Sequence, residues 1–273
     1  MISSKKLAIV VPSLTMGGLE RVSCEVANFI ATKKECEVTM VLWTDRPIFY
    51  ELNPLIKVVT PEKKKTNRFL QIIYSIKYLR RTIANIKPDV ILSFGSIFNS
   101  LTLISSTGLG IPVFVSDRSN PYRNSTFNIF KDYGISHDGL GQIILKWFFY
   151  RRAYGIIAQT KLSKEIDAKF LKHSNIEVIG NPIRQIVSKN QERENIILNV
   201  GRFTKLKNQI FLIEAFGRIN NPNWKLVFAG DGPYLQGAIE KAKELNIENK
   251  VEFLGKVQDI DSLYSKRDRK SVV

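Results

Sequence analysis

The stretch Asn199-Val-Gly-Arg-Phe-Thr-Lys-Leu-Lys-Asn-Gln-Ile-Phe211 joins an apolar run to an amphipathic segment. The apolar run, residues 196–200, is typical of a buried strand, and it breaks at Gly201. Apolar side chains then recur at helical spacing over 209–216, so the stretch predicts a strand, a tight turn and a helix. We expect Arg202 and Lys207 to lie near that helix N-terminus, where cations and free N–H groups together bind an anion such as a diphosphate. The alternative is a basic surface turn without a ligand.

The same alternation of strands and helices continues on both sides of this turn. Towards the C-terminus we expect strands over 224–229 and 251–255, helices over 234–245 and from 259, and a turn at Gly230-Asp-Gly-Pro233. Towards the N-terminus we expect strands over 7–11, 37–43, 56–60, 89–94, 112–117, 155–160 and 176–180. Helical patterns lie between them, over 18–30, 63–87, 97–107, 139–154 and 161–171.

This order predicts an α/β protein with two doubly wound, Rossmann-like domains. The polar run 188–194 is typical of an interdomain linker. We therefore predict a first domain over 1–181, a linker over 182–194 and a second domain over 195–273.

Two loops of the first domain carry candidate binding residues. Gly17 and Gly18 follow the first strand and precede a helix, so the backbone there can approach a ligand closely. A dinucleotide site would need a third glycine, which this loop lacks. The run 116–121, Ser-Asp-Arg-Ser-Asn-Pro, stands at the carboxyl end of a predicted parallel strand, where ligands bind in open α/β sheets, although it is also a good capped turn.

The composition is that of a globular protein with a strong positive charge. Hydrophobic residues make up 44%, enough for a sizeable core, and the net charge is +16. Such a charge suits nucleic acid, an anionic membrane surface or phosphorylated substrates, and also a merely solvated surface. The segment 63–87 is a basic amphipathic helix that could pack on the sheet or lie on a membrane. Cys24 and Cys36 lack metal-ligand spacing, and no metal site is expected.

Six short motifs, in order, resemble those of family-four retaining glycosyltransferases of the GT-B fold. They are Gly17-Gly-Leu-Glu-Arg21, Ser116-Asp-Arg-Ser-Asn-Pro121, Tyr154-Gly-Ile-Ile-Ala-Gln-Thr160, Gly180-Asn-Pro-Ile183, Val200-Gly-Arg-Phe203 with Lys207-Asn-Gln209, and Phe228-Ala-Gly-Asp-Gly-Pro233. Each motif alone is weak, but the ordered set covers nearly the whole chain. The resemblance implies two domains that face a cleft, the first taking the acceptor and the second a nucleotide-sugar.

The resemblance also implies roles for particular residues. Arg202 and Lys207 would be the catalytic cations that hold the donor diphosphate. Residues implied to bind donor or acceptor are Gly17, Gly18, Glu20, Arg21, Ser116, Asp117, Arg118, Asn181, Gly201, Gly230 and Gly232. Many relatives carry a histidine on the loop that holds Asp117 and Arg118 here, so a catalytic role for that loop is not assumed.

The implied reaction transfers a sugar, with retention, from a UDP- or GDP-linked donor to a glycan or polyprenyl-diphosphate-linked acceptor. No other cofactor and no nucleic-acid partner are expected, because the chain lacks a recognisable nucleic-acid module. With no membrane-spanning run or signal-peptide pattern, a cytoplasmic enzyme is expected, peripheral on the inner face of the cell membrane.

The family's donor site includes two glutamates, seven residues apart, beyond the last strand found here. We therefore expect the second domain to be incomplete and the chain to be a fragment. The alternatives are an inactive GT-B fragment that binds an acceptor and, less favoured, a basic nucleic-acid-binding protein.

Overall fold

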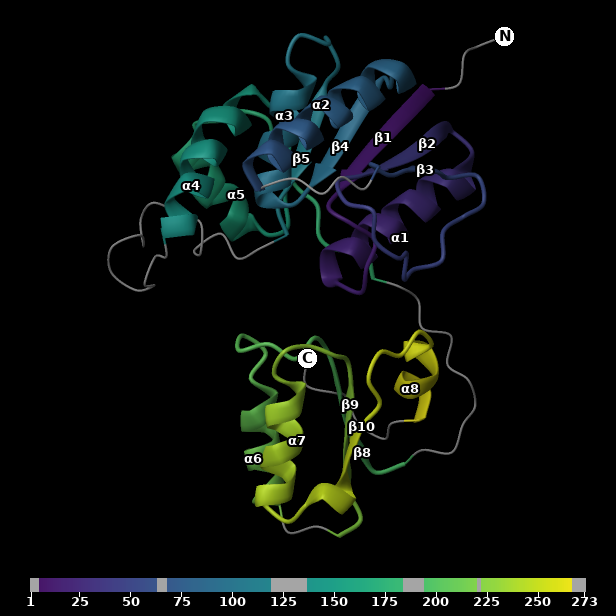
Figure 1. Ribbon diagram of the computed structural model, residues 1–273, viewed down its shortest axis with the longest axis vertical. Coiled ribbons are helices and arrows are strands. Elements are labelled where there is room, and N and C mark those ends of the chain that lie inside the picture. Colours follow the sequence, from purple (N-terminus) through teal and green to yellow (C-terminus); the bar gives the residue numbers. More distant parts are fainter. Residues whose placement is uncertain (1–4, 63–67, 119–136, 184–193, 220–221, 267–273) are drawn as a thin grey trace. The chain divides into compact units, whose positions relative to one another are not determined.

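The computed structural model describes residues 5–62, 68–118, 137–183, 194–219 and 222–266. The chain divides into two compact units, Met1–Ile183 and Arg184–Val273 (Figure 1). The predicted boundaries, 181 and 195, flank this division, and residues 184–193 of the predicted linker lie outside the described residues.

The first unit contains a seven-stranded parallel sheet with strand order β3-β2-β1-β4-β5-β6-β7. Its strands are β1 (Lys5–Val11), β2 (Cys36–Leu42), β3 (Lys57–Val59), β4 (Val90–Phe94), β5 (Val113–Ser116), β6 (Gly155–Ala158) and β7 (Ile176–Val178). Its helices are α1 (Gly18–Lys33), α2 (Arg68–Ile86), α3 (Ser96–Ser106), α4 (His137–Phe149) and α5 (Lys161–Leu171). The chain reverses its direction of winding at β1, as a doubly wound sheet requires.

Each face of this sheet has its own core. On one face α1 packs Val22, Ala27 and Ala31 against alternate residues of β1 and β2. On the other face α2, α3 and α5 cover the remaining residues of those strands and of β4, β5 and β6 (Figure 1). Leu79 and Ile83 of α2 are fully buried in this core. The near-continuous apolar runs of these strands follow from this two-sided burial.

The second unit is a three-stranded parallel sheet, ordered β10-β9-β8. Its elements are β8 (Ile196–Val200), α6 (Gln209–Gly217), β9 (Lys225–Ala229), α7 (Leu235–Glu244), β10 (Val251–Phe253) and α8 (Ile260–Lys266). Helices α6 and α7 pack side by side on one face, around Ile213, Phe228 and Ala238 (Figure 1).

The predicted α/β class and doubly wound parallel sheet are confirmed, with two local differences. The helix expected over 139–154 is α4 followed by a short 3-10 turn at Tyr150–Arg152, after which β6 begins. The helix expected over 63–87 is described from Arg68, and residues 63–67 lie outside the described part of the chain.

Candidate functional site

The loop after β8, which carries Arg202, is fixed by backbone hydrogen bonds to the last residue of β9 and to the loop that follows β9. The Gly201 N–H donates to the Ala229 carbonyl oxygen at 3.0 Å, and the Phe203 N–H donates to the Asp231 carbonyl oxygen at 3.0 Å. The Phe203 side chain is buried in the core of the unit. Arg202 lies between these two anchored residues, which fix its backbone position, and its side chain is exposed.

A tight turn then leads into α6 and carries Lys207. The carbonyl oxygen of Thr204 accepts hydrogen bonds from the N–H groups of Lys207 and Asn208, at 3.0 and 3.2 Å. Asn208 takes the left-handed conformation, with φ 47°, and the helix begins at Gln209. The Gln209 amide donates to the Arg202 carbonyl oxygen at 3.1 Å, which ties the helix start to the loop. The strand, turn and helix expected here are thus present, and Lys207 stands two residues before the helix with an exposed side chain.

Gly230 and Gly232 bring the two loops into close contact. They have φ angles of 155° and 156°, which other residues rarely adopt. A Cβ atom on Gly230 would collide with the carbonyl oxygen of Gly201, and one on Gly232 would collide with that of Phe203. The structure therefore gives both glycines a packing role beneath the Arg202 loop.

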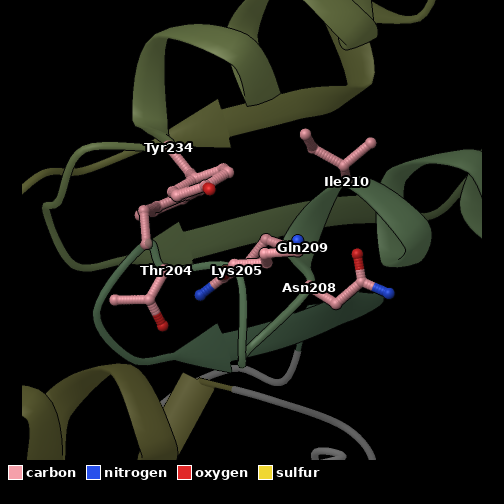
Figure 2. Close-up of a pocket in the computed structure, with 7 residues that line it drawn as sticks. Thr204, Lys205, Asn208, Gln209, Ile210 and Tyr234 are labelled. Atoms are coloured by element: carbon pink, nitrogen blue, oxygen red, sulfur yellow. The ribbon is translucent and has the colours of Figure 1, made fainter. Parts of the chain in front are cut away.

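A small pocket of about 60 Å³ lies beside this turn (Figure 2). It is lined by Phe203, Thr204, Lys205, Asn208, Gln209, Ile210 and Tyr234. The Gln209 side chain is 3% exposed, and its carbonyl oxygen has no hydrogen-bond partner among the described residues. Lys205 and Gln209 were not among the binding residues expected from the sequence, whereas neither Arg202 nor Lys207 lines the pocket.

In the first unit, the loop before α1 is organised by a tyrosine that the sequence did not point to. The Tyr50 hydroxyl accepts from the Gly17 N–H at 3.0 Å and donates to its carbonyl oxygen at 2.8 Å. Burial raises the pKa of Tyr50, so the hydroxyl keeps its proton at neutral pH. A Cβ atom on Gly17 would collide with the Glu20 carboxylate, whereas Gly18 faces open space and Arg21 is exposed.

The end of β5 contains a buried ion network. Lys146 of α4 is 3% exposed, and its ammonium nitrogen lies 2.8 Å from Asp117 Oδ2 and 2.7 Å from Asp167 Oδ1 of α5. The Tyr150 hydroxyl donates to Asp117 Oδ1 at 2.7 Å, and the Asn99 amide donates to the same oxygen at 3.3 Å. Three donors inside the unit, from Lys146, Tyr150 and Asn99, thus hold the Asp117 carboxylate in place.

The charges in this network stabilise one another against their burial. Burial alone would lower the pKa of Lys146, but the two carboxylates outweigh it and raise that pKa above its ordinary value. Burial raises the pKa of Asp167, against the lowering effect of Lys146. Burial and the nearby Asp117 raise the pKa of Tyr150 well above its ordinary value, which keeps the hydroxyl a donor. Ser116, just before the network, is fully buried.

Arg118 also follows β5, but its side chain contacts other residues than the Asp117 side chain does. Its guanidinium lies 5.4 Å from the centre of the Phe94 ring and donates from Nη1 to Asn181 Oδ1 at 2.6 Å. The Gln159 amide donates to the same Asn181 oxygen at 3.0 Å. Residues that follow β5, β6 and β7 therefore meet at one edge of the sheet.

The structure thus forms two groups of the sequence-predicted residues. Arg118 and Asn181 are in contact in the first unit, and the Arg202 loop contacts Gly230 and Gly232 in the second. Asp117 and Ser116 face the interior. Gly17 stands directly before α1, and Gly18, Glu20 and Arg21 lie in the first turn of that helix. Within the described residues no helix is long and apolar enough to cross a membrane, and no group of His, Cys, Asp or Glu could hold a metal ion.

Two family models match consecutive parts of the chain. The model described as Glycosyltransferase Family 4 matches residues 16–184, and that described as Glycosyl transferases group 1 matches residues 182–270.

Two of the curated relatives that match the chain over most of its length are glycosyltransferases of bacteria. One is the GalNAc-alpha-(1->4)-GalNAc-alpha-(1->3)-diNAcBac-PP-undecaprenol alpha-1,4-N-acetyl-D-galactosaminyltransferase of Campylobacter jejuni, 27% identical, with the match covering 96% of this chain and 70% of the relative. Another is the amylovoran biosynthesis glycosyltransferase AmsD of Erwinia amylovora, 23% identical over 95% of this chain and 71% of the relative.

Solved structures with a similar fold include HepE and WaaG. Anabaena HepE in complex with UDP and glucose has a TM-score of 0.70 at 18% identity, covering 97% of this chain and 73% of that one. WaaG, a glycosyltransferase involved in lipopolysaccharide biosynthesis, has a TM-score of 0.71 at 13% identity, covering 96% and 73%. The GT-B fold expected from the sequence motifs is confirmed.

Proposed function

The chain belongs to glycosyltransferase family 4, and on that basis we propose that it transfers a sugar, with retention, from a UDP-sugar to a lipid-linked glycan. The observation that carries this proposal is the rigid turn that presents Arg202 and Lys207 at the start of α6. UDP as the donor nucleotide is supported by the UDP complexes of HepE. A diphosphate-linked polyprenol acceptor is supported by the name of the Campylobacter enzyme.

The chemistry requires that charge be stabilised on the departing diphosphate. As the bond between the sugar C1 and the diphosphate oxygen breaks, its electron pair moves to that oxygen. The acceptor hydroxyl oxygen forms the new bond to C1 on the same face, and its proton passes to the departing diphosphate oxygen. Cations placed in advance on a fixed loop stabilise this charge without reorganising during the reaction. Arg202 can contact two phosphate oxygens through its fork of N–H groups, and Lys207 adds a second positive charge.

Replacing Arg202 or Lys207 with alanine tests the assignment. Each loss of a charge-assisted contact to the developing anion should lower turnover about 100-fold or more. Both side chains are exposed, so melting temperatures should change little. Lys243→Ala, which removes an exposed cation from α7, is the matched control and should leave turnover unchanged. The assay is UDP release with an undecaprenyl-diphosphate-linked glycan.

Near-normal turnover in both Arg202→Ala and Lys207→Ala would contradict the diphosphate assignment. Binding of the acceptor by the wild-type chain, without UDP release from any donor, would instead support the acceptor-binding alternative.

We also propose that the enzyme works at the cytoplasmic face of the membrane through α2. The inner side of α2 packs in the core through Leu79 and Ile83, while Leu70, Ile72 and Ile73 near its start are exposed. Lys77 and Arg81 are exposed on the same helix. Exposed apolar and basic side chains on one helix suit an anionic interface. Sedimentation with anionic vesicles, weakened by salt, would support this role, and equal sedimentation with neutral vesicles would contradict it.

A further inference from the structure

Arg118 is a cation whose charge is left unbalanced by its described neighbours. Its guanidinium is in contact with the Phe94 ring and a neutral amide, Asn181, and no ion pair to it occurs within the described residues. Its Nε atom is buried without a hydrogen-bond partner among those residues. Burial also lowers the pKa of Arg118. A half-buried cation of this kind is stabilised by an anion that completes its hydrogen bonds.

The adjacent carboxylate does not neutralise Arg118, because it is engaged elsewhere. Asp117 pairs with Lys146 at 2.8 Å and accepts from Tyr150 at 2.7 Å, both from the interior of the unit. The consecutive residues Asp117 and Arg118 therefore have different roles. Asp117 fixes the loop to α4, and Arg118 extends over Phe94 along the edge of the sheet.

The neighbours of Arg118 at this edge are two amide side chains, Asn181 and Gln159, that carry N–H donors. Asn181 uses its carbonyl oxygen to accept from both Arg118 and Gln159, which orients its amide NH₂ away from those two donors. Gln159 and Arg118 are donors in the same cluster. Guanidinium and amide N–H groups, gathered at the carboxyl ends of parallel strands, form an environment suited to an anion.

We propose that Arg118, with Asn181 and Gln159, binds the diphosphate of the acceptor. This inference rests on the proposed function, which gives the acceptor its diphosphate. Because Arg202 and Lys207 of the second unit are assigned to the donor diphosphate, the Arg118 cluster supplies a second, separate anion subsite. The role of the buried Asp117–Lys146 pair is to hold that subsite in place.

The test measures two ligands on the same proteins. Farnesyl diphosphate is the acceptor probe and UDP is the donor probe, each titrated calorimetrically into the full chain. Arg118→Gln should weaken farnesyl diphosphate binding about tenfold or more and leave UDP binding within about twofold. Arg118→Lys keeps the charge and should retain part of the affinity. Arg46→Gln, which removes an exposed arginine between β2 and β3, is the control for loss of one positive charge and should change neither affinity.

The outcomes separate this inference from the proposed function. Unchanged farnesyl diphosphate binding in Arg118→Gln would overturn the subsite, whether or not UDP binds. Loss of UDP binding alone would overturn it as well, since the anion would then be that of the donor. Failure of the wild-type chain to bind UDP would count against the proposed function, while an Arg118-dependent diphosphate affinity would still support the subsite. A circular dichroism melt of each variant confirms that it is folded.

Discussion

Replacing Lys146 with methionine should destabilise the first unit strongly, because it removes the cation shared by two buried carboxylates. The ammonium lies 2.8 Å from Asp117 and 2.7 Å from Asp167 and is 3% exposed. Removing one partner of a buried ion pair typically costs about 3–5 kcal/mol, since the other charge is left uncompensated. Two carboxylates lose their cation here, but Asp117 keeps hydrogen bonds from Tyr150 and Asn99. We expect a loss of about 4 kcal/mol.

The loss should depend on pH in a defined direction. Burial already raises the pKa of Asp167, and removing Lys146 would raise it further. A carboxyl whose pKa is higher in the folded state than the ordinary value of about 3.9 binds its proton more readily when folded. Folded-state stability of the variant therefore recovers as pH falls towards that ordinary value. The difference between wild type and variant should be largest near neutral pH and smaller at about pH 5.

Differential scanning calorimetry at several pH values is the measurement. A loss of about 4 kcal/mol should lower the melting temperature of a unit of this size by about 10 °C. Lys169→Met removes an exposed lysine from α5 and should stay within about 0.5 kcal/mol of wild type. A loss below about 1 kcal/mol for Lys146→Met, or a difference that widens on acidification, would refute the reasoning.

Two further substitutions test local features of the units. Gly230→Ala should destabilise the second unit by about 2–4 kcal/mol, as measured by urea titration, because its φ of 155° is strained for alanine and the new Cβ would collide with Gly201. The control Gly201→Ala places its Cβ in open space and should cost less than about 1 kcal/mol in the same titration. Thr160→Ala should cost about 1 kcal/mol by chemical denaturation, since the Thr160 hydroxyl caps α5 at the Ser163 N–H over 3.1 Å, and Thr160→Ser should retain most of that stability.

Much of the fold could be predicted because each buried strand carries its own signal. β1 and β2 are near-continuous apolar runs, and apolar residues recur at helical spacing from Gln209, where α6 begins. These patterns are local, so a single sequence reveals them. The break between α4 and the 3-10 turn at Tyr150 was not visible, because the apolar spacing continues through both.

The candidate site could be predicted only in part, because motifs identify positions but not the direction of side chains. Arg118 and Asn181 were assigned a binding role and are in contact. Asp117 was assigned a similar role, yet its carboxylate points inward to Lys146. Adjacent residues on a loop can face opposite ways, and nothing in their local spacing distinguishes them. Tyr50 and Gln159 were missed because their partners are distant in sequence.

The buried ion network can be partly inferred from the sequence, because the positions of Lys146 on α4 and Asp167 on α5 place both residues on the buried stripe of their helix. On α4, Lys146 follows the buried Ile143 by three residues and so lies on the buried stripe of that helix. On α5, Asp167 lies between Ser163 and Leu171 at intervals of four, again on the buried stripe. A buried charge requires a partner of opposite sign, so a lysine and an aspartate on the inward faces of neighbouring helices predict each other. Helical phase and charge pairing together therefore predict Lys146 and Asp167 as partners, and the structure adds Asp117, directly after β5, as the second carboxylate.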